Sequence, residues 1–245
     1  MSRFFVDPSQ IGDSQAVICD RDDIKHIKNV LRMKKGDTVT LSDSDSWEYQ
    51  CSIDEISPDE ITLKILDKQR FASEPDIKVT LFQGVPKGSK LDDVVRKTTE
   101  MGISEIVPVF MDRSVVRDNG SYHKKVTRLR SIADEASKQS GRGRIPKVSD
   151  SCGFDEMVGM LEDFDLVIFP YENEDERTIK DPLRQMEQKP DNVAVIIGPE
   201  GGFSEKEACT IKKTKAHAVS LGRSILRTET AGIVALAMIM YELEL

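Results

Sequence analysis

Long hydrophobic runs without polar alternation constrain the fold of this chain most strongly. The segment at residues 193–197 reads VAVII, and LVIFP at 166–170 is similar. A strand with one face in water alternates apolar and polar residues, whereas an apolar run is typical of a strand covered on both faces. Such strands occur mainly in parallel sheets flanked by helices, so we predict an α/β fold with a mostly parallel sheet.

The order of predicted elements supports this fold from residue 77 onward. Helical spacing of apolar residues at 90–102 and 124–141 alternates with strand-like segments, and Gly102 ends the first of these helices. The predicted strands are 78–85, 105–110, 165–172, 192–200 and 216–222.

The first 70 or so residues have a different pattern of short β segments and one helix. Apolar spacing predicts a helix over residues 20–33, with Asp20 as its N-cap. The β segments predict a compact barrel, and the polar segment 67–76 reads as a linker. We therefore expect a small domain at 1–72 and an α/β domain at 73–245.

Composition excludes several classes of protein. No apolar run reaches the roughly 18 residues of a membrane span, and we expect no signal peptide at the N-terminus. The four cysteines and three histidines are scattered without metal-ligand spacing, which argues against a metal site. Reduced thiols of this kind are typical of a cytoplasmic protein.

Charge is distributed unevenly along an acidic chain. The net charge is −8, yet residues 113–147 hold ten Lys or Arg and three acids, which gives +7 there and −15 elsewhere. A basic face of this kind can bind a polyanion such as RNA, and it can equally be a solvated helix face.

Two glycine-containing loops follow predicted strands and suggest a ligand site. Residues 198–202 read GPEGG, with capping-box spacing of Ser204 and Glu207 behind them, and 221–223 read LGR. Ligands bind beyond the carboxyl ends of strands in open sheets, and glycines let the backbone approach a flat ligand. A purine slot and a phosphate site at a helix N-terminus both remain open, although Glu200 disfavours phosphate. Thr228 or Thr230 is the predicted N-cap of the last helix.

The two loops together carry a family resemblance. The pair "IGPEGGFSEKE" and "LGRSILRTETA" resembles the ribosomal RNA small subunit methyltransferase E family, of the SPOUT class. Upstream, "QGVPKGSKLDDVVRKTTEMGISEIVPV", "DRSVV" and "EASKQSGRGRIP" are also similar, as is the N-terminal "HIKNVLRMKKGD". The resemblance implies methyl transfer from S-adenosyl-L-methionine to N3 of a uridine in small-subunit ribosomal RNA. It further implies a C-terminal trefoil knot, a PUA-like RNA-binding barrel and a homodimer.

The resemblance also implies roles for individual residues. The cofactor is expected against three loops, with these residues: Phe169, Tyr171, Ile197, Gly198, Pro199, Glu200, Gly201, Gly202, Leu221, Gly222, Ile225, Leu226, Arg227, Thr230 and Ala231. Leu226 is open to a second interpretation as a core residue.

Three residues are predicted to be catalytic. Arg227 would stabilise charge that develops on the uracil carbonyls when N3 loses its proton. Glu200, or a carboxylate of a partner subunit, is the candidate proton acceptor, and Arg142 is a further candidate.

RNA contacts are expected from both domains. The predicted residues are Arg3, Phe4, Arg32, Arg113, Ser114, Arg117, Gln139, Ser140, Arg142 and Arg144. Phe4 is interpreted either as a base-stacking residue or as part of the core.

Two other functions stay open from the sequence. One is a SPOUT methyltransferase that modifies another RNA position, and the other is a non-catalytic RNA-binding ribosome-assembly factor. The substrate is either free ribosomal RNA or an assembled 30S subunit.

Overall fold

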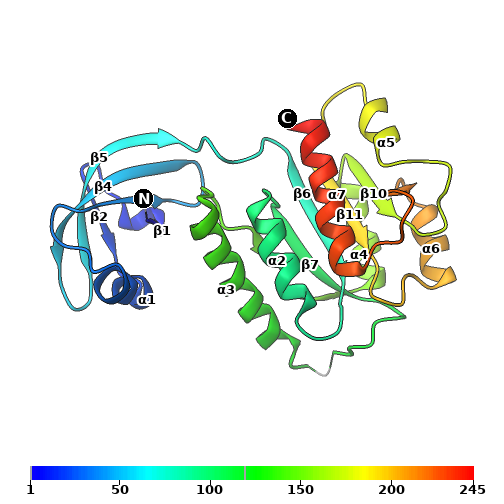
Figure 1. Ribbon diagram of the computed structural model, residues 1–245, viewed down its shortest axis with the longest axis horizontal. Helices are drawn as coiled ribbons and strands as arrows, with labels where there is room; N and C mark the ends of the chain where they lie inside the picture. The colour runs from blue at the N-terminus through cyan, green and yellow to red at the C-terminus, as the bar shows by residue number, and fades with distance from the viewer. Residues whose placement is uncertain (1, 119) are drawn as a thin grey trace. The chain divides into compact units, whose positions relative to one another are not determined.

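The computed structural model describes residues 2–118 and 120–245 and divides the chain into two compact units (Figure 1). The first unit contains the chain up to Glu74 together with Ser137–Ile145. The second unit contains Pro75–Ala136 and Pro146–Leu245. The predicted boundary between residues 72 and 73 leaves Ser137–Ile145 in the second domain, because a short return of the chain to the first unit leaves no local pattern in the sequence.

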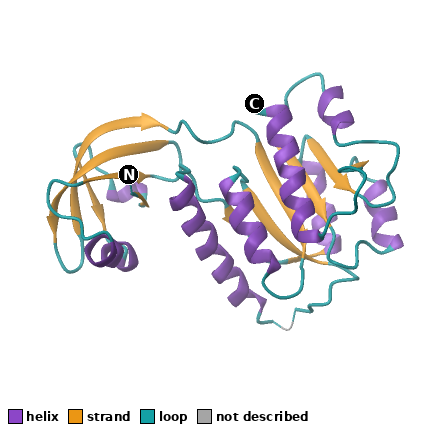
Figure 2. Cartoon of the chain, viewed as in Figure 1, coloured by secondary structure: helices purple, strands orange, loops and turns teal. Residues whose placement is uncertain are grey.

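A five-stranded sheet forms the first unit (Figure 2). Its strands lie in the order β1-β3-β4-β5-β2, with β1 parallel to β3 and the other neighbours antiparallel. The bounds are Arg3–Phe5 for β1, Gln15–Ile18 for β2, Thr38–Ser42 for β3, Trp47–Ile56 for β4 and Ile61–Arg70 for β5. The sheet is observed, and its closure into a barrel stays a prediction.

Short helical segments connect the strands of this unit. A 3-10 turn, η1, spans Pro8–Gln10. The helix predicted over 20–33 is divided into α1 (Arg21–Lys25) and a π-helical turn, η2 (His26–Val30). The Asp20 carboxylate accepts hydrogen bonds from the backbone of Asp22 and Asp23, which confirms Asp20 as the N-cap.

The second unit is built on a seven-stranded sheet in the order β12-β10-β11-β6-β7-β8, with β9 beside β7. Among the described residues every pairing in this sheet is parallel, which confirms the prediction from the apolar runs. The strands are β6 (Lys78–Gly84), β7 (Glu105–Phe110), β8 (Lys147–Val148), β9 (Cys152–Gly153), β10 (Leu166–Pro170), β11 (Asn192–Ile197) and β12 (His217–Val219).

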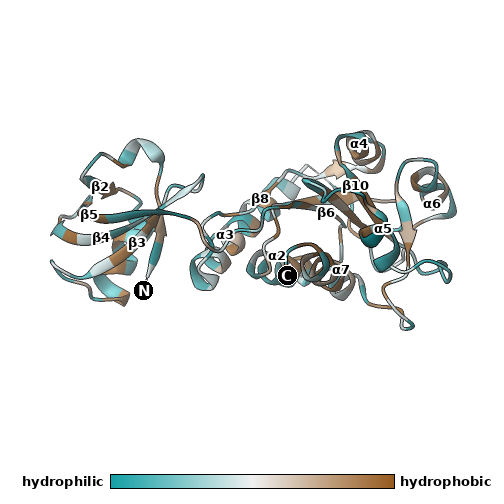
Figure 3. Ribbon diagram, turned by 90° about the horizontal axis from the view of Figure 1, so that it is seen from above, coloured by the Kyte–Doolittle hydropathy of each residue, from teal (hydrophilic) through white to brown (hydrophobic). Residues whose placement is uncertain are grey.

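Helices cover both faces of this sheet (Figure 3). Phe82 of β6 belongs to a core cluster with Met157 and Ile211, so α4 and α6 lie on one face. Leu81 lies within reach of Gly232, so α7 covers the opposite face, where α2 packs against it. The helices are α2 (Lys90–Glu100), α3 (Tyr122–Ser140), α4 (Phe154–Met160), η3 (Leu161–Asp163), α5 (Lys180–Gln185), α6 (Glu205–Lys212) and α7 (Thr228–Leu243).

None of the helices within residues 2–118 and 120–245 is long and apolar enough to span a membrane.

Candidate functional site

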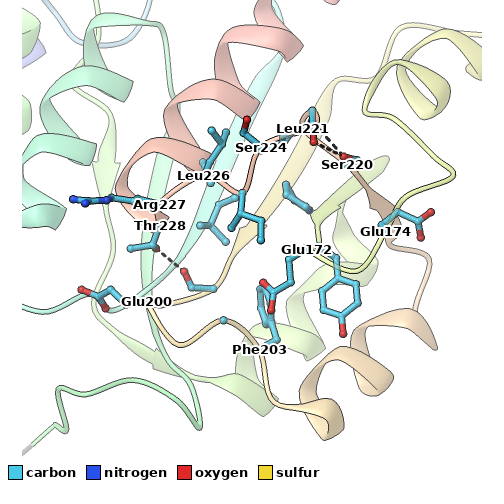
Figure 4. Close-up of a pocket in the computed structure, with 18 of the residues that line it drawn as sticks. Glu172, Glu174, Glu200, Phe203, Ser220, Leu221, Ser224, Leu226, Arg227 and Thr228 are labelled. Carbon is cyan, nitrogen blue, oxygen red and sulfur yellow. Dashed lines mark hydrogen bonds between the residues drawn. The ribbon is translucent and has the colours of Figure 1, made fainter.

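A cleft of about 860 Å³ lies at the carboxyl ends of β10, β11 and β12 (Figure 4). Its walls come from the three loops that follow these strands, together with the start of α7 and Lys90 of α2. Parallel strands bring their carboxyl ends to one edge of a sheet, where ligands of open α/β sheets bind. The volume lies within the range of small-molecule sites.

A buried hydroxyl holds two of the loops together. The Thr228 Oγ1 donates to the Gly198 carbonyl at 2.6 Å and accepts from Gln83 Nε2 at 2.8 Å. Gln83 is fully buried and Thr228 is 7% exposed, so these hydrogen bonds have little competition from water. The start of α7 is thereby fixed to the loop after β11.

The prediction that Thr228 or Thr230 starts the last helix is confirmed for Thr228, but the interpretation of either threonine as the N-cap is wrong. Arg227 occupies the N-cap position with extended backbone, and Thr228 is the first helical residue. Its hydroxyl is committed to the bond with the Gly198 carbonyl. The capping box of α6 is confirmed, since Ser204 and Glu207 exchange side-chain-to-backbone hydrogen bonds of 2.8 and 3.2 Å.

Glycines allow the close packing of the loop after β11. A Cβ at Gly198 would lie 2.9 Å from the Phe203 ring, and one at Gly202 would lie 2.9 Å from the Glu172 carboxylate. Gly202 also has φ of +66°, which disfavours residues with a side chain. Main-chain atoms therefore form much of this wall of the cleft.

Charged groups from three elements meet at one end of the cleft. Glu200 accepts hydrogen bonds from Lys90 Nζ at 2.8 Å and from the Lys87 backbone at 3.0 Å. Lys90 Nζ also lies 3.8 Å from Glu229. Partial burial raises the pKa of Glu200, but the bonds from Lys90 and Lys87 outweigh it and leave the pKa below its usual value. A carboxylate with a lowered pKa is a weaker base.

The loop before α7 forms a solvent-exposed edge of the cleft. Ile225 is 86% exposed, and the Arg227 side chain is 84% exposed. Figure 4 shows Arg227 directed away from Glu172 and Phe203. Both side chains are thus accessible to a large substrate.

Most residues predicted to contact a cofactor line this cleft. They are Tyr171, Ile197, Gly198, Pro199, Glu200, Gly202, Leu221, Gly222, Ile225, Leu226, Arg227 and Ala231. The structure thus brings together three loops that are separated by up to about 60 residues in the chain.

Three predicted residues lie outside the lining. Phe169 is fully buried and stacks under Tyr171, with ring centroids 5.2 Å apart. Gly201 accepts a hydrogen bond from Arg113 Nη1 at 3.0 Å, and Thr230 is exposed on the first turn of α7. Phe169 therefore supports the cleft from below.

Other lining residues were not predicted. Ser220 directly follows β12 and Glu172 lies two positions after β10, so the rule that ligands bind at strand ends is enough to find them. Phe203 and Lys90 also line the cleft. Lys90 stands more than 100 residues before Glu200 in the sequence, and no local pattern connects the two.

The structure corrects the predicted role of Phe4 and restricts that of Arg3. Phe4 is 2% exposed within the core of the first unit, so it is a core residue and cannot stack on a base. Arg3 is mostly buried and forms a 2.6 Å ion pair with Glu48. Arg32 is exposed, as an RNA-binding residue requires.

The structure also argues against the roles predicted for Arg142. Its guanidinium is buried and bonds to the Glu74 carboxylate at 2.7 Å, and Glu74 also accepts from the backbone of Gly143 and Arg144. An RNA or catalytic role would require breaking this buried pair, which is costly. Gln139 and Ser140 are exposed, and Arg144 is half-buried.

The remaining predicted RNA contacts lie in the loop after β7. Ser114 is 4% exposed, and its hydroxyl accepts from the Met111 backbone at 3.1 Å, so it is a turn residue and not an RNA contact. Arg113 and Arg117 are exposed residues, and their guanidinium groups donate to the carbonyls of Gly201 at 3.0 Å and Asp112 at 3.4 Å. Only these two arginines of this loop remain available to RNA.

The described residues contain no group of three or more His, Cys, Asp or Glu side chains that could hold a metal ion. Cys19, Cys51, Cys152 and Cys209 are free thiols.

Comparisons with known proteins cover the whole chain. The RNA methyltransferase domain family matches residues 73–240, and the RNA methyltransferase PUA domain family matches residues 18–66. The chain is 32% identical to ribosomal RNA small subunit methyltransferase E of Bacillus subtilis, over 100% of this chain and 98% of the relative. It is 30% identical to ribosomal RNA small subunit methyltransferase E 2 of Borreliella burgdorferi, over 97% and 96%.

Two solved structures share the complete fold. A putative methyltransferase of Legionella pneumophila, in complex with the cofactor SAM, has 28% identity and a TM-score of 0.85, covering 98% of this chain and 96% of that one. Ribosomal RNA small subunit methyltransferase E of Neisseria gonorrhoeae, bound to S-adenosyl methionine, has 26% identity and a TM-score of 0.86, covering 98% and 97%.

Proposed function

This chain belongs to the ribosomal RNA small subunit methyltransferase E family, and we propose that it methylates N3 of a uridine in small-subunit ribosomal RNA. The observation that carries the proposal is the cleft at the ends of β10, β11 and β12, in a chain that matches this family from end to end. Its methyl donor is S-adenosyl-L-methionine, which two structural relatives contain.

The residues of the cleft fit this cofactor. Bound S-adenosyl-L-methionine supplies an electrophilic methyl group on a sulfonium centre. The backbone around Gly198 and Leu221 offers hydrogen-bonding groups to adenine and ribose, and Ile197 and Leu226 offer apolar contact. The Glu172 carboxylate lines the same cleft and is complementary to the cationic groups of the cofactor.

Uridine N3 carries a proton that must leave during methylation. The exposed Arg227 guanidinium, 4.0 Å from Glu229, is suited to stabilise negative charge on the uracil carbonyls. Glu200 remains the candidate proton acceptor within this chain, but its lowered pKa favours a second role, in which it holds Lys90 at the end of the cleft. Alignment of N3 with the methyl group supplies a further part of the acceleration.

Methylation requires an RNA in which N3 of the target uridine is accessible. N3 lies on the Watson–Crick edge of uracil, so the target base has to be unpaired or flipped out. Arg113, which bonds the Gly201 carbonyl, and Arg117 are suited to hold phosphates of the surrounding strand. The substrate is ribosomal RNA, either free or in the 30S subunit, and the proposed location of the activity is the cytoplasm.

A homodimer and a knot belong to the same proposal. Helix α7 is apolar around much of its circumference, and Tyr241 on it is 69% exposed, as expected for a helix covered by a second copy. The chain passes from β12, at the edge of the sheet, back to α7 on β6 and β11, which is compatible with a trefoil knot. The PUA-like barrel also belongs to the proposal, with a domain boundary near residues 72 and 73 and with Ser137–Ile145 as a later part of the first unit.

The test is mass spectrometry of small-subunit RNA after incubation with the protein and labelled S-adenosyl-L-methionine. We expect one N3-methyluridine that is absent without the protein. Replacement of Arg227 by Ala should lower kcat about 100-fold while cofactor affinity is retained, because an electrostatic stabiliser of the transition state is lost. A methyl group at a different position would identify another SPOUT activity, and RNA binding without methyl transfer would identify an assembly factor.

A further inference from the structure

A cluster of cationic and aromatic side chains lies at one end of the first unit. Lys68 Nζ lies 4.4 Å from the centre of the Trp47 ring, and the Arg70 guanidinium carbon lies 5.3 Å from the same ring. Arg144 lies 5.8 Å from the Phe71 ring. We name these five residues the cation–aromatic cluster. None of the catalytic or cofactor assignments above uses Lys68, Arg70, Trp47 or Phe71.

Strand pairing brings the cluster together. In the β4–β5 ladder Trp47 pairs with Arg70 and Tyr49 pairs with Lys68, so the four side chains share one face of the sheet. Lys68 also lies 5.3 Å from the Tyr49 ring. Both cations are exposed, and Trp47 is half-buried against the core.

A tight turn and a distant segment complete the cluster. The Asp43 carboxylate accepts hydrogen bonds of 2.9 Å from the backbone of Ser46 and Trp47, which fixes the turn before β4. Arg144 Nε donates to the Asp45 carbonyl of this turn at 2.8 Å. Arg144 is held there by the buried carboxylate of Glu74, which accepts from its backbone.

Two of the nearby acids, Glu48 and Asp43, are engaged in hydrogen bonds or an ion pair. Glu48 is bonded to Arg3 and to Gln69, so its charge is compensated. The Asp43 carboxylate accepts a hydrogen bond from the backbone of the turn. Asp67 pairs with Gln50 in the ladder, one position from Lys68 and on the opposite face of the strand. The exposed Asp45 carboxylate, which accepts from Ser46 Oγ at 3.3 Å, offsets one of the three cations, so the cluster keeps a net positive charge.

We propose that the cation–aromatic cluster is a binding site for single-stranded RNA. Exposed cations held at fixed aromatic rings suit the phosphates of a flexible strand, and an unpaired base can stack on the indole ring when Lys68 and Arg70 turn from it toward those phosphates. Such a site reads RNA through backbone charge and stacking, with little sequence preference. The inference rests on the proposed function for its choice of RNA, and it replaces Phe4 by Trp47 as the stacking residue of this unit.

The test measures the affinity of the full protein for a fluorescein-labelled single-stranded RNA by anisotropy over a range of salt concentrations. Replacement of both Lys68 and Arg70 by Gln should weaken binding about tenfold. It should also reduce the slope of log affinity against log salt by about 1.4, since about 0.7 is expected per phosphate contact. The matched control replaces Lys35 and Lys64 by Gln, which removes the same charge from the same unit at the Asp54 ion pairs. Equal effects of the two double variants would overturn the proposal.

Substitutions of Trp47 test the stacking contribution separately. Trp47→Leu should lower affinity about tenfold because the planar ring is lost, while Trp47→Phe should retain most of it. Identical affinities for the two variants would also overturn the proposal. Titration with S-adenosyl-L-methionine distinguishes a failure of the cluster assignment from a failure of the proposed function. If every variant binds the cofactor and methylates RNA but the cluster variants bind RNA normally, only the cluster assignment fails.

Discussion

The cofactor cleft and the cation–aromatic cluster differ in the groups that they present to a ligand. The wall of the cleft after β11 is built from glycines and backbone groups, held in place by the buried Thr228 hydroxyl. The cluster is built from exposed charged side chains on aromatic rings. A small, uniform ligand can be held by rigid main-chain geometry, whereas a long polyanion requires charge that adapts to its path. The cleft should therefore be sensitive to shape, and the cluster to charge and salt.

The strongest test of this separation is the Glu74→Gln substitution. It leaves the buried guanidinium of Arg142 without its charged partner, so we expect the first unit to lose about 3–5 kcal/mol of stability. The single tryptophan, Trp47, lies in this unit, and its fluorescence during urea unfolding reports the change. RNA affinity should fall together with this stability, because the backbone of Arg144 loses the carboxylate that holds it in place. The exposed Glu55→Gln is the control, and a loss of cofactor affinity in Glu74→Gln would contradict the separation.

The Gly202→Val substitution changes the shape of the cleft without changing any charge. A β-branched side chain at φ of +66° is strained, and its Cβ would collide with the Glu172 carboxylate. We expect S-adenosyl-L-methionine to bind about 100-fold more weakly by calorimetry, while RNA affinity is retained. Gly159→Ala serves as control, since a Cβ there meets open space. Normal cofactor binding by Gly202→Val would place the cofactor elsewhere.

The buried hydroxyl of Thr228 offers a finer test of the same region. Thr228→Val keeps the shape but leaves the Gly198 carbonyl and Gln83 amide without this partner, at a cost of about 1–3 kcal/mol. Cofactor affinity should fall about tenfold in calorimetry, and Thr228→Ser should restore it. Failure of Ser to rescue would show that packing of the methyl group, not the hydrogen bonds, positions the loop.

Lys90→Gln should have the smallest effect on ligand binding of these four substitutions. Lys90 is the side-chain donor that lowers the pKa of Glu200, so this pKa should rise toward its ordinary value in the variant. The native ion pair is present above the ordinary pKa of Glu and is lost as pH falls through the lowered pKa, whereas the variant lacks this pair at every pH and its Glu200 carboxylate should become protonated at a higher pH. NMR titration of the Glu200 carboxylate measures the shift. An unchanged pKa would assign the lowering to the backbone N–H groups of Glu200 itself and of Lys87.

Sequence by itself determined the class of the fold and the edge of the sheet where the cleft lies. Apolar runs such as 193–197 require cover on both faces, and glycines at strand ends permit the close approach of loops, so both signals are local. Only the tertiary structure decided that Lys90 reaches the cleft, that Thr228 bonds to Gly198 and that Arg142 is buried against Glu74. The same is true of Arg144, which joins Phe71 and the turn at Asp45. These contacts join residues between 30 and 110 positions apart, and the identity of a residue does not reveal which distant partner will neutralise or bury it.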